Sequence, residues 1–419
     1  MLDNAETGNF ILLDDLIENY APNLQEVFKL RPEYKALWTS LDGHIYQIGR
    51  SQEMFGLTNT HGIHWINKDW LDTEGLSVPA TIEEYEAVMK TLVASDPNGN
   101  GKADEIGLSF IDGEAQAWRN HGGPGALFGA FGMADTGDHI AVKDGAVLLT
   151  ANTDAYKQGV QWLRSLYETG LIDPDSFSQT EPQMTAKGSA EDEVFISFID
   201  WDAYQTVGVD RADSYVAIPP LLGPAGEKKW SRENVSEVSR NAAVITKACE
   251  YPEAAMRWLD YGFDPKVSAR INWGEVGSMF EENADGMLTY KDVDAIWETT
   301  LEGTPHVFPR AILDEYYDKY YEYPPDASYV LGIREETYFD YMPAEYYPEL
   351  MMTSEDATEL ATYALAVNSI IDERRAVWIT SGGIEEEWDR YLSDLESAGL
   401  SRYLEIKQKY YDAYLENLD

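Results

Sequence analysis

Two stretches in the first half of the chain have apolar residues at helical spacing. In residues 79–95 an apolar face follows Thr81 and Glu84, which together form the signature of a capping box. A second apolar face runs from Asp154, the expected N-cap, to Gly170, where the helix is expected to stop. Each stretch is predicted to form an amphipathic helix, because a helix gathers residues with this spacing on one face.

Short apolar runs bounded by polar or turn residues follow these helices. Their length and composition predict strands: VFISFI at 194–199, YVAIPPL at 215–221 and AAVIT at 242–246. The last part of the chain has helical spacing instead, with Gly382, Gly383 and Gly399 as the expected breaks. Strands that alternate with helices indicate an α/β fold, here with a helix-rich C-terminal part.

Length and charge limit the classes of function. At 419 residues the chain is long enough for two or three domains. Its 75 acidic and 31 basic residues give a formal net charge of −44, which argues against sequence-independent binding to nucleic acid or to anionic lipid surfaces. No apolar run has the length of a membrane span, and the start MLDNAETGNF lacks the basic and apolar regions of a signal peptide.

The cysteine and aromatic content limits the kinds of site that the chain can form. The single cysteine, Cys249, excludes an internal disulfide framework and a cysteine-based zinc site. The chain has 27 Tyr and 12 Trp, many of them with polar neighbours. Such residues suit surfaces that stack on sugar rings, because sugars present C–H faces to the π-system and hydroxyls to nearby polar groups. Core packing is the alternative for any single one.

The segment DPNGNGKADE, which starts at Asp96, places side-chain oxygens at alternate positions. Asp96, Asn98 and Asn100 occupy positions 1, 3 and 5 of a loop, and Gly101 at position 6 permits a sharp turn. Lys102 at position 7 would contribute its backbone carbonyl, so its ammonium group can point into solvent. An EF-hand calcium loop begins in this way.

The rest of the loop departs from the EF-hand. That pattern requires a bidentate Glu at position 12, where this chain has Gly107, and the carboxylates of Asp104 and Glu105 come early instead. Three carboxylates, two amide oxygens and a carbonyl still match the hard oxygen ligands that Ca²⁺ prefers. We therefore expect a structural calcium site; the alternative is a solvated Asn-Gly turn without an ion.

The residues around this loop resemble those of a known family. The block WINKDWLDTEGLSVPATIEEYEAVMKTLVASDPNGNGKADEIGLS at 65–109 resembles the extracellular solute-binding proteins, family 1 type, of bacterial carbohydrate ABC importers. Within that family it is similar to the lipoprotein branch related to alginate-oligosaccharide-binding proteins. Further agreement lies at 128–133, 156–177, 245–263 and 388–415, so the resemblance covers nearly the whole chain.

The resemblance implies a two-lobed periplasmic-binding-protein fold, also called a Venus-flytrap fold. It assigns 1–110 and 241–305 to the N-terminal lobe, 111–240 and 306–419 to the C-terminal lobe, and crossovers to 108–113, 238–243 and 300–310. Members of the family carry an export signal, a lipid-modified cysteine and a first βαβ unit before the part that matches here. The chain is therefore expected to be an N-terminally truncated reading of a longer protein.

In function, the resemblance implies a non-enzymatic receptor that captures an oligosaccharide between its lobes and delivers it to the permease of an ABC importer. The protein is expected to be a monomer at the extracellular face of the cell membrane or in the periplasm, held at the membrane only by a lipid anchor absent from this chain. In this family calcium is bound by the positions that correspond to Asp96, Asn98, Asn100, the Lys102 carbonyl, Asp104 and Glu105. The strong negative charge favours a neutral sugar.

Ligand-binding residues are predicted among aromatic residues beside expected strand ends and turns, where open α/β sheets place their ligands. Trp201 follows an apolar strand and is flanked by Asp202 and Tyr204, an arrangement that suits stacking with hydrogen bonding. Trp118 and Arg119 lie just past the first expected crossover and are predicted to contact ligand as well.

Other candidates carry a stronger core alternative. Trp273 lies in a glycine-rich turn where the chain is expected to leave the N-terminal lobe, and Trp65 lies beside a strand, a position that favours the core. The tyrosine-rich segment 316–323 is interpreted either as the rim of the cleft or as a half-buried helix. His61 and His64 lack a partner pattern for a metal and are interpreted as polar loop histidines.

Two other classes of function stay open from the sequence. A glycoside-active enzyme would need two carboxylates on opposite sides of a cleft, and among 75 acidic residues no pattern selects such a pair. A calcium-stabilised surface adhesion or scaffold protein would use the loop only for rigidity. Titration with sugars, combined with product analysis, separates both classes from a receptor.

Overall fold

The computed structural model describes residues 8–112, 123–234, 237–291, 304–305 and 307–418. The strands of its two larger sheets are β1 (Ile48–Gln52), β2 (Ile63–Asn67), β3 (Ile106–Ser109), β6 (Phe195–Asp200), β7 (Tyr215–Ala217), β8 (Val238–Ala243) and β11 (Ala311–Ile312). Two hairpins pair β4 (Ile140–Lys143) with β5 (Ala146–Leu149) and β9 (Phe280–Glu282) with β10 (Leu288–Tyr290).

Helices cover these sheets and form most of the C-terminal part. The α-helices are α2 (Asp14–Tyr20), α3 (Pro22–Leu30), α4 (Pro32–Trp38), α5 (Lys68–Thr73), α6 (Ile82–Ser95), α7 (Asp154–Glu168), α8 (Glu181–Gly188), α9 (Ala203–Val207), α10 (Val209–Ala212), α11 (Pro252–Tyr261), α12 (Pro265–Trp273), α14 (Pro325–Thr337), α15 (Ser354–Ser381), α16 (Ile384–Ser397) and α17 (Leu400–Glu416). The 3₁₀ helices are η1 (Leu57–Asn59), η2 (Pro124–Phe131), η3 (Thr150–Asn152), η4 (Pro174–Phe177), η5 (Asp314–Tyr316) and η6 (Phe339–Tyr341).

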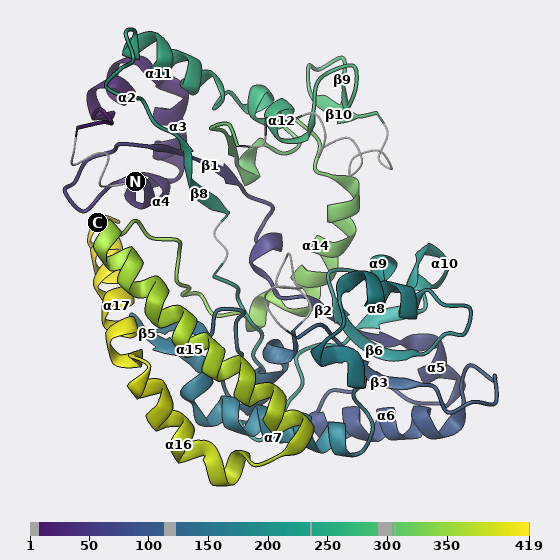
Figure 1. Cartoon of the computed structure of the whole chain (residues 1–419). Coiled ribbons are helices and arrows are strands. Elements are labelled where there is room, and N and C mark those ends of the chain that lie inside the picture. The colour runs from purple at the N-terminus through teal and green to yellow at the C-terminus, as the bar shows by residue number, and fades with distance from the viewer. Residues whose placement is uncertain (1–7, 113–122, 235–236, 292–303, 306, 419) are drawn as a thin grey trace.

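The elements form two halves, each built around its own sheet (Figure 1). The first half contains the three-stranded sheet in the order β11-β1-β8, with α2 and α3 packed against α11. The second half contains the four-stranded sheet in the order β3-β6-β2-β7. In Figure 1, α14 lies on one side of the segments that connect the two sheets, and the pair α15 and α17 lies on the other.

Close packing fixes the first sheet at Gly49 of β1. A Cβ on this residue would lie 2.2 Å from the Ser239 carbonyl oxygen of β8 and 2.5 Å from the ring of Trp38, which is fully buried. No larger residue fits there, because protein interiors have almost no free volume. Strand β1 pairs in parallel with β11 and antiparallel with β8 on its other edge.

The predicted strands are present, but two of them differ from the prediction in their bounds. Strand β6 lies between β2 and β3, and its residues are buried as far as Ile199, as a strand covered on both faces requires. The strand predicted at 215–221 ends at Ala217, because Pro219 and Pro220 cannot donate to a ladder. The strand predicted at 242–246 begins earlier, at Val238, and lies in the first sheet.

The helix signals in the sequence are mostly confirmed. Thr81 caps α6 by accepting from the Glu84 amide at 3.1 Å, and the Glu84 carboxylate accepts from the Thr81 amide at 3.3 Å. The N-cap of α7 was expected at Asp154 but is Thr153, whose hydroxyl accepts from the Tyr156 amide. The breaks at the three C-terminal glycines are present, with positive φ at each. None of the helices in the described ranges is long and apolar enough to cross a membrane.

The strand pairings divide the chain at other places than the expected lobe boundaries. The range 1–110 was expected to form one lobe, yet β2 and β3 pair with β6 and β7 and not with β1. The chain leaves the first sheet after Gln52 and enters the second at Ile63, well before the crossover expected near 108–113. Similarly, β11 lies beyond the expected 305/306 boundary but pairs with β1. Apolar strands fit either sheet by composition, so only the pairing decides.

Candidate functional site

The segment 53–59 carries the chain from the first sheet to the second and holds an exposed aromatic residue. Phe55 has a φ of 54°, and its amide donates to the Asp314 carboxylate at 2.8 Å. A positive φ is uncommon for a bulky residue, so the surroundings hold this turn in place. The Phe55 ring is 37% exposed, and its centroid lies 5.5 Å from the rings of Tyr317 and Tyr323.

Aromatic residues from both sides of this crossing form what we call the aromatic belt: Phe55, Trp201, Trp273, Tyr317 and Tyr323. Tyr317 lies 6.2 Å from Trp273 and 4.8 Å from Tyr323 between ring centroids, separations typical of favourable aromatic pairs. At the other end, the Arg334 guanidinium lies 4.1 Å from the centroid of the Trp201 ring and donates to the Leu57 carbonyl of the crossing segment at 2.6 Å. The belt therefore reaches from α12 in the first half to the end of β6 in the second.

Three predicted ligand residues follow β6 directly. Trp201 is only 9% exposed. Asp202 caps α9, with its carboxylate accepting from the Gln205 amide at 2.7 Å, and is largely buried. Tyr204, on the first turn of α9, is 53% exposed and presents most of its side chain to solvent. Burial also raises the pKa of the neighbouring Asp200 carboxyl to about 6.

The remaining predicted tryptophans differ in their surroundings. Trp65 lies inside β2 and is fully buried, in agreement with the core alternative. Trp273 is not in an open turn as expected but is the last residue of α12, buried against Tyr290 and Tyr321; the turn starts one residue later. Trp118 and Arg119 fall outside the described residues.

The tyrosine-rich segment 316–323 is not a helix beyond the last residue of η5. Four of its tyrosines are buried or nearly so, and two of them belong to the belt: Tyr316, Tyr317, Tyr321 and Tyr323. Tyr317 donates to the Glu53 carbonyl at 2.8 Å, which fixes the segment to the crossing. Of the two interpretations of this segment, the position beside the crossing favours the rim of the cleft.

The two histidines interpreted as polar loop residues are both buried. His64 lies in β2, where its Nε2 is 3.0 Å from the Tyr85 hydroxyl, and burial lowers its pKa to about 3. His61 has Nδ1 2.8 Å from the Glu233 carboxylate and Nε2 2.6 Å from the Gly123 carbonyl oxygen. Their neighbours are distant in sequence, so no local pattern could have revealed this burial.

Carboxylates lie close together at the crossing segment 53–59. The Glu53 carboxylate, 4% exposed, accepts two hydrogen bonds from the Arg31 guanidinium, at 2.6 and 2.7 Å, and one from the Tyr34 hydroxyl. Glu237, just before β8, accepts from the Met54 amide at 3.3 Å. Burial, reinforced by the nearby charge of Glu53, raises the pKa of the Glu237 carboxyl to about 7.

This raised pKa predicts a pH-dependent stability that Glu237→Gln removes. The folded state keeps a proton that the unfolded chain releases near pH 4.5, so this stabilisation is complete below that pH and is lost as pH rises through 7. The variant is expected to melt about 4 °C above the wild type at pH 8 and at the same temperature near pH 5. Differential scanning calorimetry at both pH values measures the difference. Equal melting temperatures at pH 8 would show that Glu237 ionises normally.

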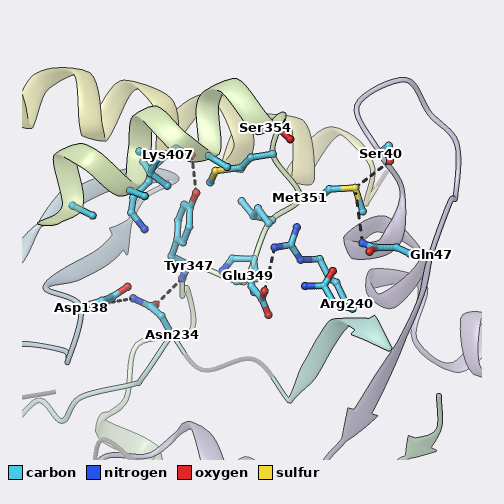
Figure 2. A pocket seen from close by; sticks show the side chains of 18 of the residues that line it. Ser40, Gln47, Asp138, Asn234, Arg240, Tyr347, Glu349, Met351, Ser354 and Lys407 are labelled. Atoms are coloured by element: carbon cyan, nitrogen blue, oxygen red, sulfur yellow. Dashed lines mark hydrogen bonds and ion pairs between the residues drawn. The ribbon is translucent and has the colours of Figure 1, made fainter. Parts of the chain in front are cut away.

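A cavity of mixed polar and apolar lining lies on the α15 side of the crossing, and we call it the interlobe chamber. It has a volume of about 630 Å³, within the range of ligand pockets, and is lined from both halves. Its walls come from the start of the first half, from β8, from the irregular segment 347–352, and from α15 and α17 (Figure 2).

Charged groups in the chamber are mostly paired. Figure 2 shows Arg240 bound to Glu349, with Nη2 3.2 Å from the carboxylate. Lys407 of α17 is buried and lies 4.2 Å from the centre of the Tyr347 ring, and burial lowers its pKa. Among the described residues no carboxylate lies within 4.0 Å of this ammonium. The Tyr347 ring also stacks on Tyr411, so it is less available to a sugar than the belt.

A smaller cavity of about 60 Å³ adjoins the chamber and contains a buried ionic cluster. Arg375 of α15 has Nη2 2.8 Å from the Asp112 carboxylate, and His139 has Nδ1 2.8 Å from the Asp135 carboxylate. Burial opposes a charge on His139, but the charge and hydrogen bond of Asp135 outweigh it and raise the pKa of the imidazole. The sequence pattern did not reveal this cluster because its two pairs, Asp135 with His139 and Asp112 with Arg375, come from distant parts of the chain.

The loop DPNGNGKADE begins where α6 ends and has the backbone that the sequence predicts. Asp96, Gly99 and Gly101 have positive φ values of 51°, 69° and 74°. The Lys102 ammonium points away from the loop to Asp192, which leaves its backbone carbonyl as the only possible ligand atom of that residue. Asn98 donates to the Glu193 carbonyl at 2.9 Å and ties the loop to the approach to β6.

The oxygens of this loop fit a cation. Both carboxylate oxygens of Glu105 and one of Asp96 are buried and have no hydrogen-bond partner in the described structure. Buried polar atoms normally have partners, so these three oxygens indicate a missing ligand. Burial raises the pKa of Glu105, and the carboxylates of Asp104 and Asp96 add to the increase. No three His, Cys, Asp or Glu side chains in the described ranges are gathered closely enough to hold an ion by themselves, so amide and carbonyl oxygens would have to complete the site.

Comparison with known proteins shows the family to which this chain belongs. The family profile of the bacterial extracellular solute-binding proteins matches residues 10–269. The fructooligosaccharide ABC transporter substrate-binding protein FusA of Streptococcus pneumoniae is 38% identical over 430 residues, which span 100% of this chain and 78% of FusA.

Solved structures agree. FusA in complex with kestose has a TM-score of 0.85 at 38% identity and covers 99% of this chain and 86% of that one. An EF-hand mutant of FusA in complex with fructo-nystose has the same TM-score at 37% identity, with the same coverage. The alginate-binding protein AlgQ2 shares the fold at 20% identity, with a TM-score of 0.70 over 98% of this chain and 83% of AlgQ2. The chain therefore belongs to the bacterial extracellular solute-binding proteins and is a substrate-binding receptor of that family.

Proposed function

We propose that this protein captures a neutral oligosaccharide between its two halves, at the aromatic belt, and delivers it to the permease of an ABC transporter. The observation that carries the proposal is that the belt joins aromatic side chains from both halves across one crossing segment, with Phe55 exposed and the other four largely buried around it. A fructose-based oligosaccharide is the first candidate, because FusA binds this class at 38% identity.

We assign roles to the belt residues and to the predicted ligand residues near them by their exposure. Tyr204 and Phe55 are exposed enough to contact a sugar ring, and Trp201 offers the edge that remains accessible. Asp202 would accept hydrogen bonds from sugar hydroxyls, while Trp273 packs against Tyr317 and supports its ring. Trp118 and Arg119, which follow β3 in the sequence, are also proposed to contact the ligand. Trp65 is too deeply buried to contact a ligand and is assigned to the core.

Binding is proposed to close the two halves on the sugar. A ligand shifts a conformational equilibrium only by its differential contacts, and a ligand that spans the belt gains contacts to both halves only when they are close together. The permease would then recognise the closed form. We propose a monomer at the extracellular face of the cell membrane, held there by a lipid anchor as in a lipoprotein.

We also propose that the loop at 96–105 binds a structural Ca²⁺ ion. The ligands would be the side-chain oxygens of Asp96, Asn98, Asn100, Asp104 and Glu105 with the Lys102 carbonyl. The buried, unpartnered oxygens of Glu105 and Asp96 support this set, and an EF-hand mutant exists for FusA. The loop lies at the far end of α6 from the belt, so the ion would stabilise the second half and not contact the sugar.

Isothermal titration with a sugar panel tests the receptor function. The panel contains kestose and fructo-nystose, a glucose-based trisaccharide of the same size, and an anionic alginate trisaccharide. We expect saturable binding of a neutral member, unchanged sugar after incubation as measured by chromatography, and no binding of the anionic one. New products would establish a glycoside-active enzyme instead, and no binding to any member would overturn the choice of ligand.

A further inference from the structure

Arg334 is a buried cation that lacks an ionic partner. It lies in α14 and is fully buried, and among the described residues no carboxylate is within ion-pair distance of it. Its Nη1 donates to the Leu57 carbonyl at 2.6 Å, but Nε and Nη2 have no partner. Burial lowers its pKa to about 9. A charge buried in this way without an ion pair lowers the stability of the folded state.

The main contact of the guanidinium is the Trp201 indole. The central carbon lies 4.1 Å from the ring centroid, the geometry of a cation–π interaction. One face of the indole is therefore covered by Arg334, and a sugar has to approach the other side or the edge. Because side chains with a fixed orientation bind with less loss of entropy, a cation behind the ring prepares Trp201 for stacking.

The same helix is anchored firmly in the second half. One turn after Arg334, the Tyr338 hydroxyl donates to the Ile218 carbonyl at 2.8 Å and accepts from the His64 amide at 3.1 Å. The Tyr338 ring stacks on Trp230 at 4.2 Å. Leu57, in contrast, belongs to the segment that crosses between the halves. Arg334 thus joins the belt, the anchored end of α14 and the crossing segment.

We infer that Arg334 is a positioning residue for ligand binding: it holds the Trp201 indole in its stacking orientation and ties that orientation to the crossing segment at Leu57. The inference rests on the proposed function, because it requires that Trp201 contact the sugar. This role accounts for a buried cation without an ion pair at this point, where an apolar residue would give a more stable fold.

A double-mutant cycle measured by titration with kestose tests the inference. Trp201→Leu is expected to weaken binding about 30-fold and Arg334→Met about tenfold. Arg334→Met in the Trp201→Leu background is expected to have almost no further effect, because the ring that it positions is gone. Additive effects of the two changes would overturn the inference. If Trp201→Leu alone leaves the affinity unchanged, the site named in the proposed function fails instead.

The chain offers a matched control in Arg232. Its guanidinium lies 4.2 Å from the Tyr346 ring and donates to the Ala344 carbonyl at 2.9 Å, so it makes the same two kinds of contact away from the belt. Arg232→Met is expected to leave kestose affinity within about twofold of the wild type. An equal loss of affinity in this variant would show a general effect on the fold and would contradict a specific role for Arg334.

If Arg334→Met does not fold, Arg334→Lys tests whether binding needs a cation at this position. In Arg334→Lys burial makes the ammonium lose its proton at lower pH than a solvated one, although Asp200, Asp202, Tyr323 and Tyr338, the groups that act on Arg334, oppose this loss. We expect near-normal kestose binding at pH 6 and about tenfold weaker binding at pH 8, while the wild type, whose guanidinium stays charged between these pH values, binds equally at both. Binding by the lysine variant that does not change with pH would show that the cation is not needed.

Discussion

Removal of calcium is expected to lower the melting temperature of this protein by about 5–10 °C. An ion that binds only the folded state stabilises it by mass action, about 4 kcal/mol when calcium exceeds its dissociation constant a thousandfold. The structure gives this expectation a local cause, because Glu105 and Asp96 hold buried carboxylate oxygens without partners. The measurement is a thermal melt in calcium, in EGTA, and in EGTA followed by excess calcium. Identical melts in all three conditions would exclude the site.

Variants of the loop separate an ion site from a solvated turn. Glu105→Gln is expected to abolish most of the response to calcium, and in EGTA it should melt slightly above the wild type. The reason for the second effect is that burial raises the pKa of Glu105, so the free carboxylate destabilises the ion-free loop. Lys102→Met serves as the control and should keep the full calcium response, since its ammonium group points to Asp192. A calcium response lost in both variants would contradict the assigned ligands.

Trp201→Leu is expected to weaken binding of the preferred oligosaccharide about 30-fold, equivalent to about 2 kcal/mol. Leucine keeps apolar volume but removes both the aromatic edge offered to a sugar and the ring that Arg334 contacts. Because Trp201 is only 9% exposed, the change should also lower the melting temperature. Titration well below the melt, corrected for the fraction of active protein, therefore measures the affinity.

Lys407→Met distinguishes the belt from the interlobe chamber. The ammonium of Lys407 forms no ion pair with any residue that the structure describes, and burial lowers its pKa, so methionine should be tolerated or slightly stabilising. With the sugar at the belt, this variant is expected to bind kestose within about twofold of the wild type. A large loss with Lys407→Met and none with Trp201→Leu would place the oligosaccharide in the chamber.

Short-range signals in the sequence predicted local structure well. The capping box of Thr81 and Glu84, the glycine at 399 and the loop at 96–105 all depend on contacts within a few residues, which is why they can be read directly. The exact N-cap of α7 differs by one residue, because Thr153 and Asp154 are both good caps and the backbone at Thr153 is extended. Family resemblance supplied what local signals could not, namely the two-lobed fold and the receptor function.

The chain by itself determined the α/β class, the positions of most helices and strands, and the oxygen-rich loop, because spacing, capping and turn chemistry act over short distances. Tertiary structure alone decided which sheet β2 and β3 join, and that Trp273 is buried inside the belt. It also decided that Arg334 meets Trp201. These facts depend on contacts between residues that lie well apart along the chain, such as Arg334 and Trp201, and burial, not sequence spacing, selects such contacts.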